Sequence, residues 1–251
     1  MKGSNDRAWG MFVGARILTE VVVLLSCFGD AALALPLASL GPSENSAVFA
    51  HVNSRDFCTG ATLQQHDDGV FEFAFAWESW GNAPPDWGAW AECYDADFVC
   101  GIEFLFSRAY DWWPLALMDV YVWADDGQAP PDNNPGAVIY LAAGVDPGEI
   151  AVWPEISVHH VQVCRPTGGP HFVGFWGNWV DSMPAWYLAV DTNGPAGCPR
   201  TNVYLEGWQR PDEWTGPLTS LGIREYGGPG DCAPTPAVPP TWGAIKAMFR
   251  R

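Results

Sequence analysis

The sequence predicts an all-β fold, an antiparallel β-sandwich or jelly roll, and three observations lead to this prediction. Apolar and polar residues alternate with a period of two in many short segments after residue 45, as they do in half-buried strands. Clusters of Gly, Pro, Asn and Asp separate these segments and are typical of turns. The 27 Gly and 22 Pro residues are also too many for a helix bundle.

The strands are expected in order along the chain. Segment 71–78 is the clearest, because its large aromatic residues fall on one face and small or acidic residues on the other. Similar alternation predicts strands at 46–52, 87–94, 98–107, 118–124, 137–142, 157–164, 171–177, 185–191 and 202–208. Many short strands without helical patterns between them are typical of sandwiches and jelly rolls. Residues 35–226 are therefore expected to form a single domain.

Residues 1–34 are expected to be a secretory signal peptide with a helical core. Basic residues such as Arg16 precede the apolar run 17–28, and small residues up to Ala34 provide a cleavage site. The run is too short and, with Glu20, too charged to span a membrane. No transmembrane span is therefore expected in the mature chain.

Cys27 supports a second interpretation of the same segment. Residues 24–27, Leu-Leu-Ser-Cys, resemble a lipobox, in which Cys27 is lipidated and becomes the mature N-terminus. Both interpretations export the protein, so we expect it to be secreted or held at the cell surface.

The cysteines that remain after residue 34 are expected to form disulfides. They are even in number, as in many exported proteins with a disulfide framework: Cys58, Cys93, Cys100, Cys164, Cys198 and Cys232. A zinc site would need closer pairs such as Cys-x2-Cys, whereas six residues separate Cys93 from Cys100. We expect a local Cys93–Cys100 bridge across a polar turn at 94–99.

The charge of the chain excludes one class of partner. The sequence has 29 acidic and 12 basic side chains, a formal net charge of −17. Removal of 1–34 does not change this charge, because that segment contains three acidic and three basic residues. Nucleic acid is therefore not an expected partner, since proteins that bind it carry clustered Lys and Arg.

Tryptophan is the most unusual feature of the composition, with 15 residues. Three tryptophans lie on predicted strands and are expected in the core: Trp77, Trp123 and Trp186. The tryptophans of predicted loops are candidates for binding glycans, because exposed aromatic rings stack on apolar faces of sugars. These candidate ligand-binding residues are Trp80, Trp87, Trp112, Trp113 and Trp179.

An acidic connection between two predicted strands is a candidate calcium site. Asp125, Asp126, Asp132 and Asn133 offer the oxygen ligands that Ca²⁺ takes. The alternative is that these are solvated acidic turns, which keep an exported protein soluble.

Catalytic arrangements are few. No Gly-x-Ser-x-Gly motif is present. Glu72 and Glu78 lie on one strand, about 20 Å apart, which is too far for the paired carboxylates of a glycosidase. Glu72 paired with Glu103 or Asp119 on a neighbouring strand would be the alternative, a glycan-acting hydrolase. His159 and His160 are adjacent in a strand and should point to opposite faces.

The C-terminus changes character. Residues 227–240 are rich in Pro and Gly and are expected to form an extended linker. Residues 241–251 follow as a short amphipathic helix, either a docking tag or a tail that folds back onto the domain. The residues expected to dock are Trp242, Ile245, Lys246, Phe249 and Arg250.

Three motifs carry a resemblance to a group of proteins. They are Asp-Val-Tyr-Val-Trp at 119–123, Pro-Gly-x-Val-Ile at 135–139 and the tail motif Thr-Trp-Gly-x-Ile-Lys at 241–246. Over 118–164 and 217–251 the chain resembles uncharacterised exported β-sandwich proteins of environmental bacteria. The resemblance implies that the tail is a sorting or attachment tag, read by secretion or surface-attachment machinery.

Together these features favour a binding or structural protein rather than an enzyme. We expect an exported β domain that binds glycans through loop tryptophans, or that serves as a component of a surface matrix.

Overall fold

The computed structural model describes residues 37–42, 48–49, 60–77, 88–110, 116–178, 186–203 and 206–228. The chain divides into two compact units, Met1–Leu35 and Pro36–Arg251, and every described residue belongs to the second unit. The signal peptide predicted at 1–34 therefore lies outside the described residues, and so does Cys27.

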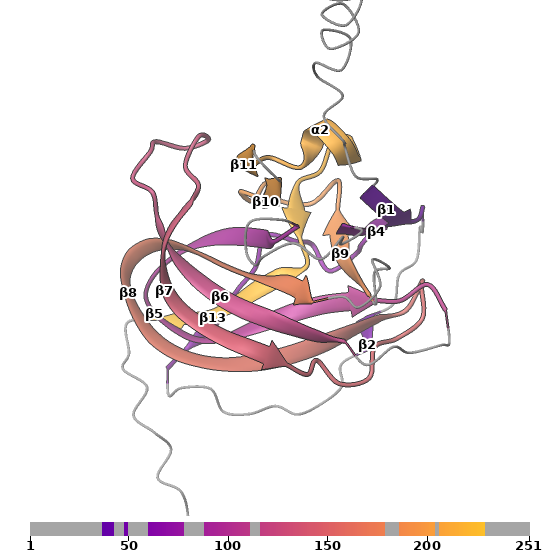
Figure 1. Ribbon diagram of the computed structural model, residues 1–251, viewed down its shortest axis with the longest axis horizontal. Helices are drawn as coiled ribbons and strands as arrows, with labels where there is room; N and C mark the ends of the chain where they lie inside the picture. Colours follow the sequence, from indigo (N-terminus) through magenta and orange to yellow (C-terminus); the bar gives the residue numbers. More distant parts are fainter. Residues whose placement is uncertain are drawn as a thin grey trace, which may run out of the picture. The chain divides into compact units, whose positions relative to one another are not determined.

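The described part of the chain is almost entirely antiparallel β-structure, so the all-β prediction is confirmed (Figure 1). Its only helix is the single turn α2, Asp212–Thr215. The strands are β1 (Leu37–Leu40), β2 (Val48–Phe49), β3 (Thr62–Gln64), β4 (Phe73–Trp77), β5 (Trp90–Ser107), β6 (Leu117–Asp125), β7 (Pro135–Val145), β8 (Ile156–Asn178), β9 (Tyr187–Asp191), β10 (Arg200–Val203), β11 (Gly207–Gln209), β12 (Ser220–Leu221) and β13 (Ile223–Gly228).

These strands form one sheet whose main path is β1-β4-β9-β5-β8-β6-β7. Six further strands lie off this path: β13 pairs with β5 and β3, and β10 pairs with β5 and β11. β12 pairs with β9, and β2 pairs with β8 as the parallel exception. Most of the sheet is therefore organised around β5 and β8, which pair with each other almost from end to end.

β5 and β8 are each longer than the sequence predicts. The polar segment 94–99, predicted to be a turn, and the Thr-Gly-Gly-Pro segment 167–170, which separates the predicted strands 157–164 and 171–177, both lie inside these strands. The register of the pair shifts between Ala96 and Phe98 and again between Val99 and Gly101. Bulges of this kind bend a strand without ending it, and Figure 1 shows the two strands curling together.

Aromatic side chains from both strands pack together in the main hydrophobic core. Phe175 on β8 contacts Phe106 at the end of β5, with ring centroids 5.0 Å apart. Phe175 is also the register partner of Trp90 at the start of β5. The curl therefore brings the two ends of β5 to the same cluster. Trp77 and Trp186, both nearly fully buried, belong to it, which confirms their predicted core positions.

A second buried cluster lies on the other face of β6 and β8. Tyr121 stacks on Trp123, with ring centroids 4.8 Å apart. Trp208 from β11 meets Trp123 edge to face at 5.1 Å, so the β10–β11 hairpin covers this face. Trp123 is 1% exposed, and its predicted core position is confirmed as well.

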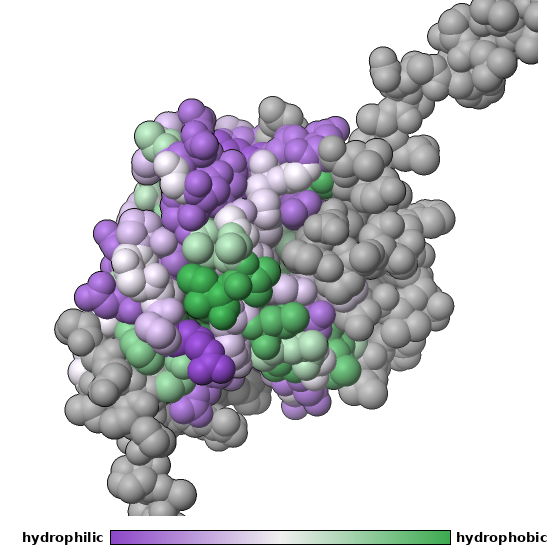
Figure 2. Space-filling model, turned by 60° about the vertical axis from the view of Figure 1, so that its left-hand side comes forward, coloured by the Kyte–Doolittle hydropathy of each residue, from purple (hydrophilic) through white to green (hydrophobic). Residues whose placement is uncertain are grey.

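β7 is the last strand on the main path of the sheet and pairs only with β6 among the described strands. Its eleven residues contain no charged side chain, and Val138 and Leu141 are about half exposed. Figure 2 brings forward the side where β7 and β8 lie in Figure 1, and apolar residues gather on that face. Three irregularities interrupt the β6–β7 register.

The C-terminal boundary of the domain differs slightly from the prediction. Gly227 and Gly228 were assigned to the linker, but they pair with Val99 and Phe98 as the end of β13. A Cβ on Gly227 would meet the carboxylate of Glu225 and the Cβ of Ala96, so a larger residue there would require these side chains to move. The remainder of the predicted linker, 229–240, lies outside the described residues.

Candidate functional site

The β6–β7 loop contains the four residues expected to bind calcium. Asp125 accepts a hydrogen bond from the backbone N–H of Gly127 at 2.7 Å and another from the side-chain amide of Asn133 at 2.8 Å. Asp126 accepts the N–H of Gln128 at 3.0 Å, and Asp132 is exposed. The structure therefore brings Asp125 and Asn133 together, and much of the oxygen lining is already bonded within the loop.

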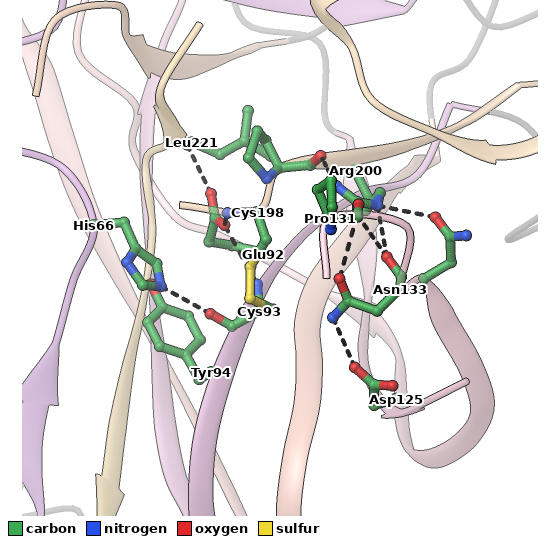
Figure 3. Close-up of a disulfide and its surroundings, with 12 residues drawn as sticks. His66, Glu92, Cys93, Tyr94, Asp125, Pro131, Asn133, Cys198, Arg200 and Leu221 are labelled. Carbon is green, nitrogen blue, oxygen red and sulfur yellow. Dashed lines mark hydrogen bonds between the residues drawn. A yellow bond between two sulfur atoms is a disulfide. The ribbon is translucent and has the colours of Figure 1, made fainter. Parts of the chain in front are cut away.

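A guanidinium group lies among the oxygens of this loop (Figure 3). Arg200 on β10 is 1% exposed, and its Nε donates to the carbonyl oxygen of Asn133 and the side-chain oxygen of Asn134, both at 2.9 Å. Its Nη2 donates to the carbonyl oxygens of Asn133 and Pro131, and its Nη1 to that of Pro199. Burial lowers the pKa of Arg200, and the charge of Arg210 adds to this effect.

All of these hydrogen bonds from Arg200 end on neutral oxygens. Carbonyl and amide oxygens are also ligands of Ca²⁺, but here they solvate a cation that belongs to the protein. The loop is held to β10 through Arg200, and calcium binding by the loop stays a prediction.

A second polar cluster, which we call the disulfide cluster, consists of His66, Glu92, Cys93 and Cys198 (Figure 3). β10 pairs with the start of β5 through Arg200 and Ala91. Continuing this antiparallel register by two residues places Cys198 opposite Cys93, and the two form a disulfide with Cα atoms 5.6 Å apart.

The predicted Cys93–Cys100 disulfide is therefore wrong. The residues between these cysteines are strand rather than turn, and seven residues of extended chain separate Cα atoms by about 20 Å, far beyond the reach of a disulfide. Cys100 and Cys164 are also disulfide-bonded. The Cys93–Cys198 bond is consistent with an oxidising environment such as the cell exterior.

Glu92 is the fully buried member of the disulfide cluster. Its Oε1 accepts the backbone N–H of Cys198 at 2.6 Å, and its Oε2 accepts that of Leu221 at 3.0 Å. Burial raises the pKa of Glu92, while the nearby His66 and the backbone N–H groups oppose the rise. The carboxylate thus links β5 to two segments that are distant in sequence.

His66 completes the disulfide cluster. Its ring stacks on Tyr94 with centroids 5.0 Å apart and an angle of 16° between the planes. Its Nε2 lies 2.9 Å from the carbonyl oxygen of Cys93. Potential ligand atoms of His66, Glu92, Cys93 and Cys198 all lie within 4.8 Å of one another.

Sequence reasoning missed this cluster and also Arg200. The four members are spread over more than 100 residues and show no metal-ligand spacing. One signal was present, since Glu92 is a charged residue in a mostly apolar strand, where a carboxylate needs buried partners.

A third group of polar side chains lies side by side on the neighbouring strands β8, β5 and β13. Glu103 on β5 lies opposite His160 on β8 and Arg224 on β13. Glu103 accepts a hydrogen bond from the Tyr226 hydroxyl at 2.6 Å, and Arg224 pairs with Asp67 through Nε at 2.8 Å. Burial and the bond to Glu103 raise the pKa of Tyr226 to about 12. These contacts fasten the segment around Asp67 to the sheet.

The carboxylates of the alternative hydrolase site form hydrogen bonds with different parts of the chain. Glu72 accepts the backbone N–H of Thr192 at 2.9 Å and the side-chain amide of Asn193 at 2.7 Å. Asp119 accepts the N–H of Gly144 at 2.8 Å. Within the described residues, no hydrogen bond or shared partner joins Glu72 to Glu103 or Asp119.

A groove of about 580 Å³ lies between segment 145–149 and residues 158–162 of β8. His159 bonds to Ser157 through Nε2 at 2.7 Å and to the carbonyl oxygen of Pro147 through Nδ1. Ser157 is fully buried, so this pair fixes segment 145–149 on β8 rather than presenting a nucleophile. His159 packs against Phe106 and His160 lies near Glu103, which confirms that the two histidines use opposite faces.

The remaining predicted site residues lie outside the described residues. This applies to the five loop tryptophans, Trp80, Trp87, Trp112, Trp113 and Trp179, and to the tail residues Trp242, Ile245, Lys246, Phe249 and Arg250. The strand ends that border the three tryptophan segments are nevertheless described. In the part of the chain that the structure covers, no helix has the length and hydropathy needed to cross a membrane.

Those strand ends lie side by side. The end of β5 pairs with the start of β9 through Ser107 and Tyr187, and the start of β6 pairs with the end of β8 through Leu117 and Asn178. The last residue of β4, Trp77, stacks on the first residue of β5 at 6.0 Å. Segments 78–87, 111–115 and 179–185 thus begin and end near neighbouring strand ends.

Comparisons with family models, with curated proteins and with solved structures found no match to the chain. The geometry of the described residues is therefore the basis for any statement about function.

Proposed function

We propose that this chain is an exported, disulfide-stabilised β protein that binds extracellular material, and that its ligands are glycans held by loop tryptophans. The observation that carries the proposal is the convergence of strand ends around Phe106, Phe175 and Trp186. Three segments that contain all five candidate tryptophans start and finish at these strand ends.

Convergence is relevant because a single ring contributes little to sugar binding. Aromatic contacts contribute about 0.5–1.5 kcal/mol each, so useful affinity needs several rings on one surface. Loops that leave neighbouring strand ends can provide such a surface on a rigid scaffold. In this proposal the curled sheet acts as the sandwich or jelly-roll scaffold. The disulfides are an argument for export, because such bonds persist in oxidising compartments.

Two further parts of the proposal concern the ends of the chain. Residues 1–34 act as the export signal, and 241–251 act as the tag that attaches the protein to a surface. Deleting 241–251 should change localisation while the near-UV circular dichroism of the domain stays the same. A loss of that signal would instead support the alternative in which the tail folds back and packs on the domain.

A glycan array followed by titration calorimetry tests the binding function. Trp80→Ala, Trp112→Ala and Trp179→Ala should each weaken the best glycan about tenfold, which corresponds to about 1.4 kcal/mol. Tyr140→Ala is the control, because this aromatic side chain lies in the middle of β7, opposite Val122 on β6 and under Arg165. Absence of glycan binding, or equal affinity in all four variants, would refute the glycan proposal and leave the structural role.

A further inference from the structure

We propose that the disulfide cluster is a binding site for a thiophilic divalent metal ion, zinc above all, when the Cys93–Cys198 bond is reduced. The inference does not depend on glycan binding. It assigns to the same two sulfur atoms a second state, in which they bind a metal instead of each other.

The donor set is the first argument. Reduction would leave two thiolates, one imidazole and one carboxylate within a single cluster, from Cys93, Cys198, His66 and Glu92. These are the ligand types that zinc takes in tetrahedral sites. The set has two soft sulfur donors, which hard cations such as Ca²⁺ do not prefer.

The distances fit a small rearrangement. The potential ligand atoms lie within 4.8 Å of one another. Bonds of about 2.0–2.3 Å to zinc imply ligand atoms about 3.3–3.8 Å apart in a tetrahedron. The outer ligands need to move inward by about 1 Å, and the two sulfur atoms need to separate. The Cα atoms of the cysteines, 5.6 Å apart, can remain in place.

The surroundings orient the ligands before any metal arrives. The Tyr94 ring holds His66 by stacking, and the backbone N–H groups of Cys198 and Leu221 hold the Glu92 carboxylate. Outer contacts of this kind fix metal ligands in proteins. Glu92 is buried, whereas His66 and both cysteines are partly accessible, so an ion has a route to the sulfur atoms.

The chemistry balances with a named reductant. A water-soluble phosphine attacks the disulfide and is oxidised to the phosphine oxide, taking its oxygen from water. The two electrons cleave the sulfur–sulfur bond, and the two protons of that water convert the sulfurs to thiols. Zn²⁺ then displaces these two protons as it binds the thiolates.

The experiment titrates Zn²⁺ and Co²⁺ into the full chain before and after reduction with the phosphine, under argon. Calorimetry measures the affinity for zinc, and the charge-transfer absorption of cobalt reports thiolate ligation. The reduced protein should gain one site with cobalt–thiolate absorption that the oxidised protein lacks. Zinc should also slow the return of the disulfide when air is admitted.

Variants separate this site from the other cysteines. The double variant Cys93→Ser/Cys198→Ser should lose the site, whereas Cys100→Ser/Cys164→Ser, the matched control with two other disulfide-bonded cysteines, should keep it. His66→Ala should lower the affinity for zinc by at least about tenfold. The loss of a contact that only orients a ligand already lowers metal affinity about 10–100-fold, and His66 is itself a ligand in this proposal.

Three results would overturn the proposal. The first is a metal site that survives in Cys93→Ser/Cys198→Ser, and the second is zinc affinity that is unchanged in His66→Ala. The third applies if the chain unfolds on reduction, which is seen as a loss of the far-UV circular dichroism. If one equivalent of zinc does not restore that signal, the cluster does not bind zinc. Restoration in the wild type and not in the double variant would support the proposal.

Discussion

Replacing Arg200 with alanine should destabilise the domain by about 2–4 kcal/mol. The guanidinium donates to the carbonyl oxygens of Pro131, Asn133 and Pro199, and all three would lose this donor. Pro131 is exposed, whereas Asn133 and Pro199 are buried. A buried polar group left without a partner costs about 1–3 kcal/mol, so the two buried carbonyls give about 2–6 kcal/mol. Water entering the vacated polar space satisfies part of this demand, which places the expected loss in the lower half of that range.

The assay is urea denaturation of the disulfide-intact protein, followed by tryptophan fluorescence. Arg200→Lys should recover part of the loss, because an ammonium keeps the charge but cannot reach all of the oxygens that the planar guanidinium reaches. Arg165→Ala is the control, since Arg165 is exposed on β8 and surface changes cost less than about 0.5 kcal/mol. Loss of less than about 1 kcal/mol in Arg200→Ala would refute the reasoning that this side chain organises the β6–β7 loop.

Three further changes test other parts of the fold. Cys93→Ser/Cys198→Ser opens a loop with a sequence separation of 105 and should cost up to about 4.8 kcal/mol on the chain-entropy model, measured by urea denaturation. His171→Asn tests the buried pair with Glu225, 2.6 Å apart. Burial disfavours the charge of His171, but the hydrogen bond and charge of Glu225, together with the Gly169 carbonyl and Asp95, outweigh it and raise the pKa of His171 above its ordinary 6.5. Its contribution to stability is therefore complete below pH 6.5 and is lost as the pH rises through the folded-state pKa, so unfolding at several pH values should show the wild-type advantage shrinking. Gly174→Ala places a Cβ against the carbonyl oxygen of Trp90 and should cost at least about 3 kcal/mol, seen as lost stability or lost near-UV circular dichroism.

Each of these expectations can fail clearly. Equal stability of the serine variant and the wild type would show that other bonds already restrict the unfolded chain. Parallel pH profiles for the wild type and His171→Asn between pH 5 and 8 would contradict a raised pKa of His171. A Gly174→Ala protein as stable as the wild type would show that β5 and β8 can separate locally without cost.

The sequence was sufficient for the fold class because alternation survives in most strands. Segment 71–78, for example, places its aromatic side chains on one face, and β4 is found there with Phe75 and Trp77 buried. The continuity of β5 and β8 was not predictable in the same way. Each bulge shifts the alternation by one residue, so a single bent strand has the same pattern as two strands and a turn.

The candidate site was less predictable than the fold, for a different reason. Cys93 meets Cys198 only because β10 pairs with the start of β5, and the order of strands in a sheet leaves no local pattern in the chain. Arg200 gave no signal either, since its partners are backbone carbonyls, which every residue has. The acidic loop was found by composition, but composition did not show which cation its oxygens contact.

Within the described part of the sheet, β7 pairs with a strand on one side alone, and this has a consequence for how the protein behaves at high concentration. An uncharged strand with apolar side chains at the rim of a sheet can extend into the same strand of another molecule. At neutral pH the net charge of −17 makes each molecule repel its copies, and this long-range repulsion keeps the edges apart. Near the isoelectric point of about 4.4 that repulsion vanishes, so colloidal stability should be lowest in mildly acidic solution while the fold itself is still intact.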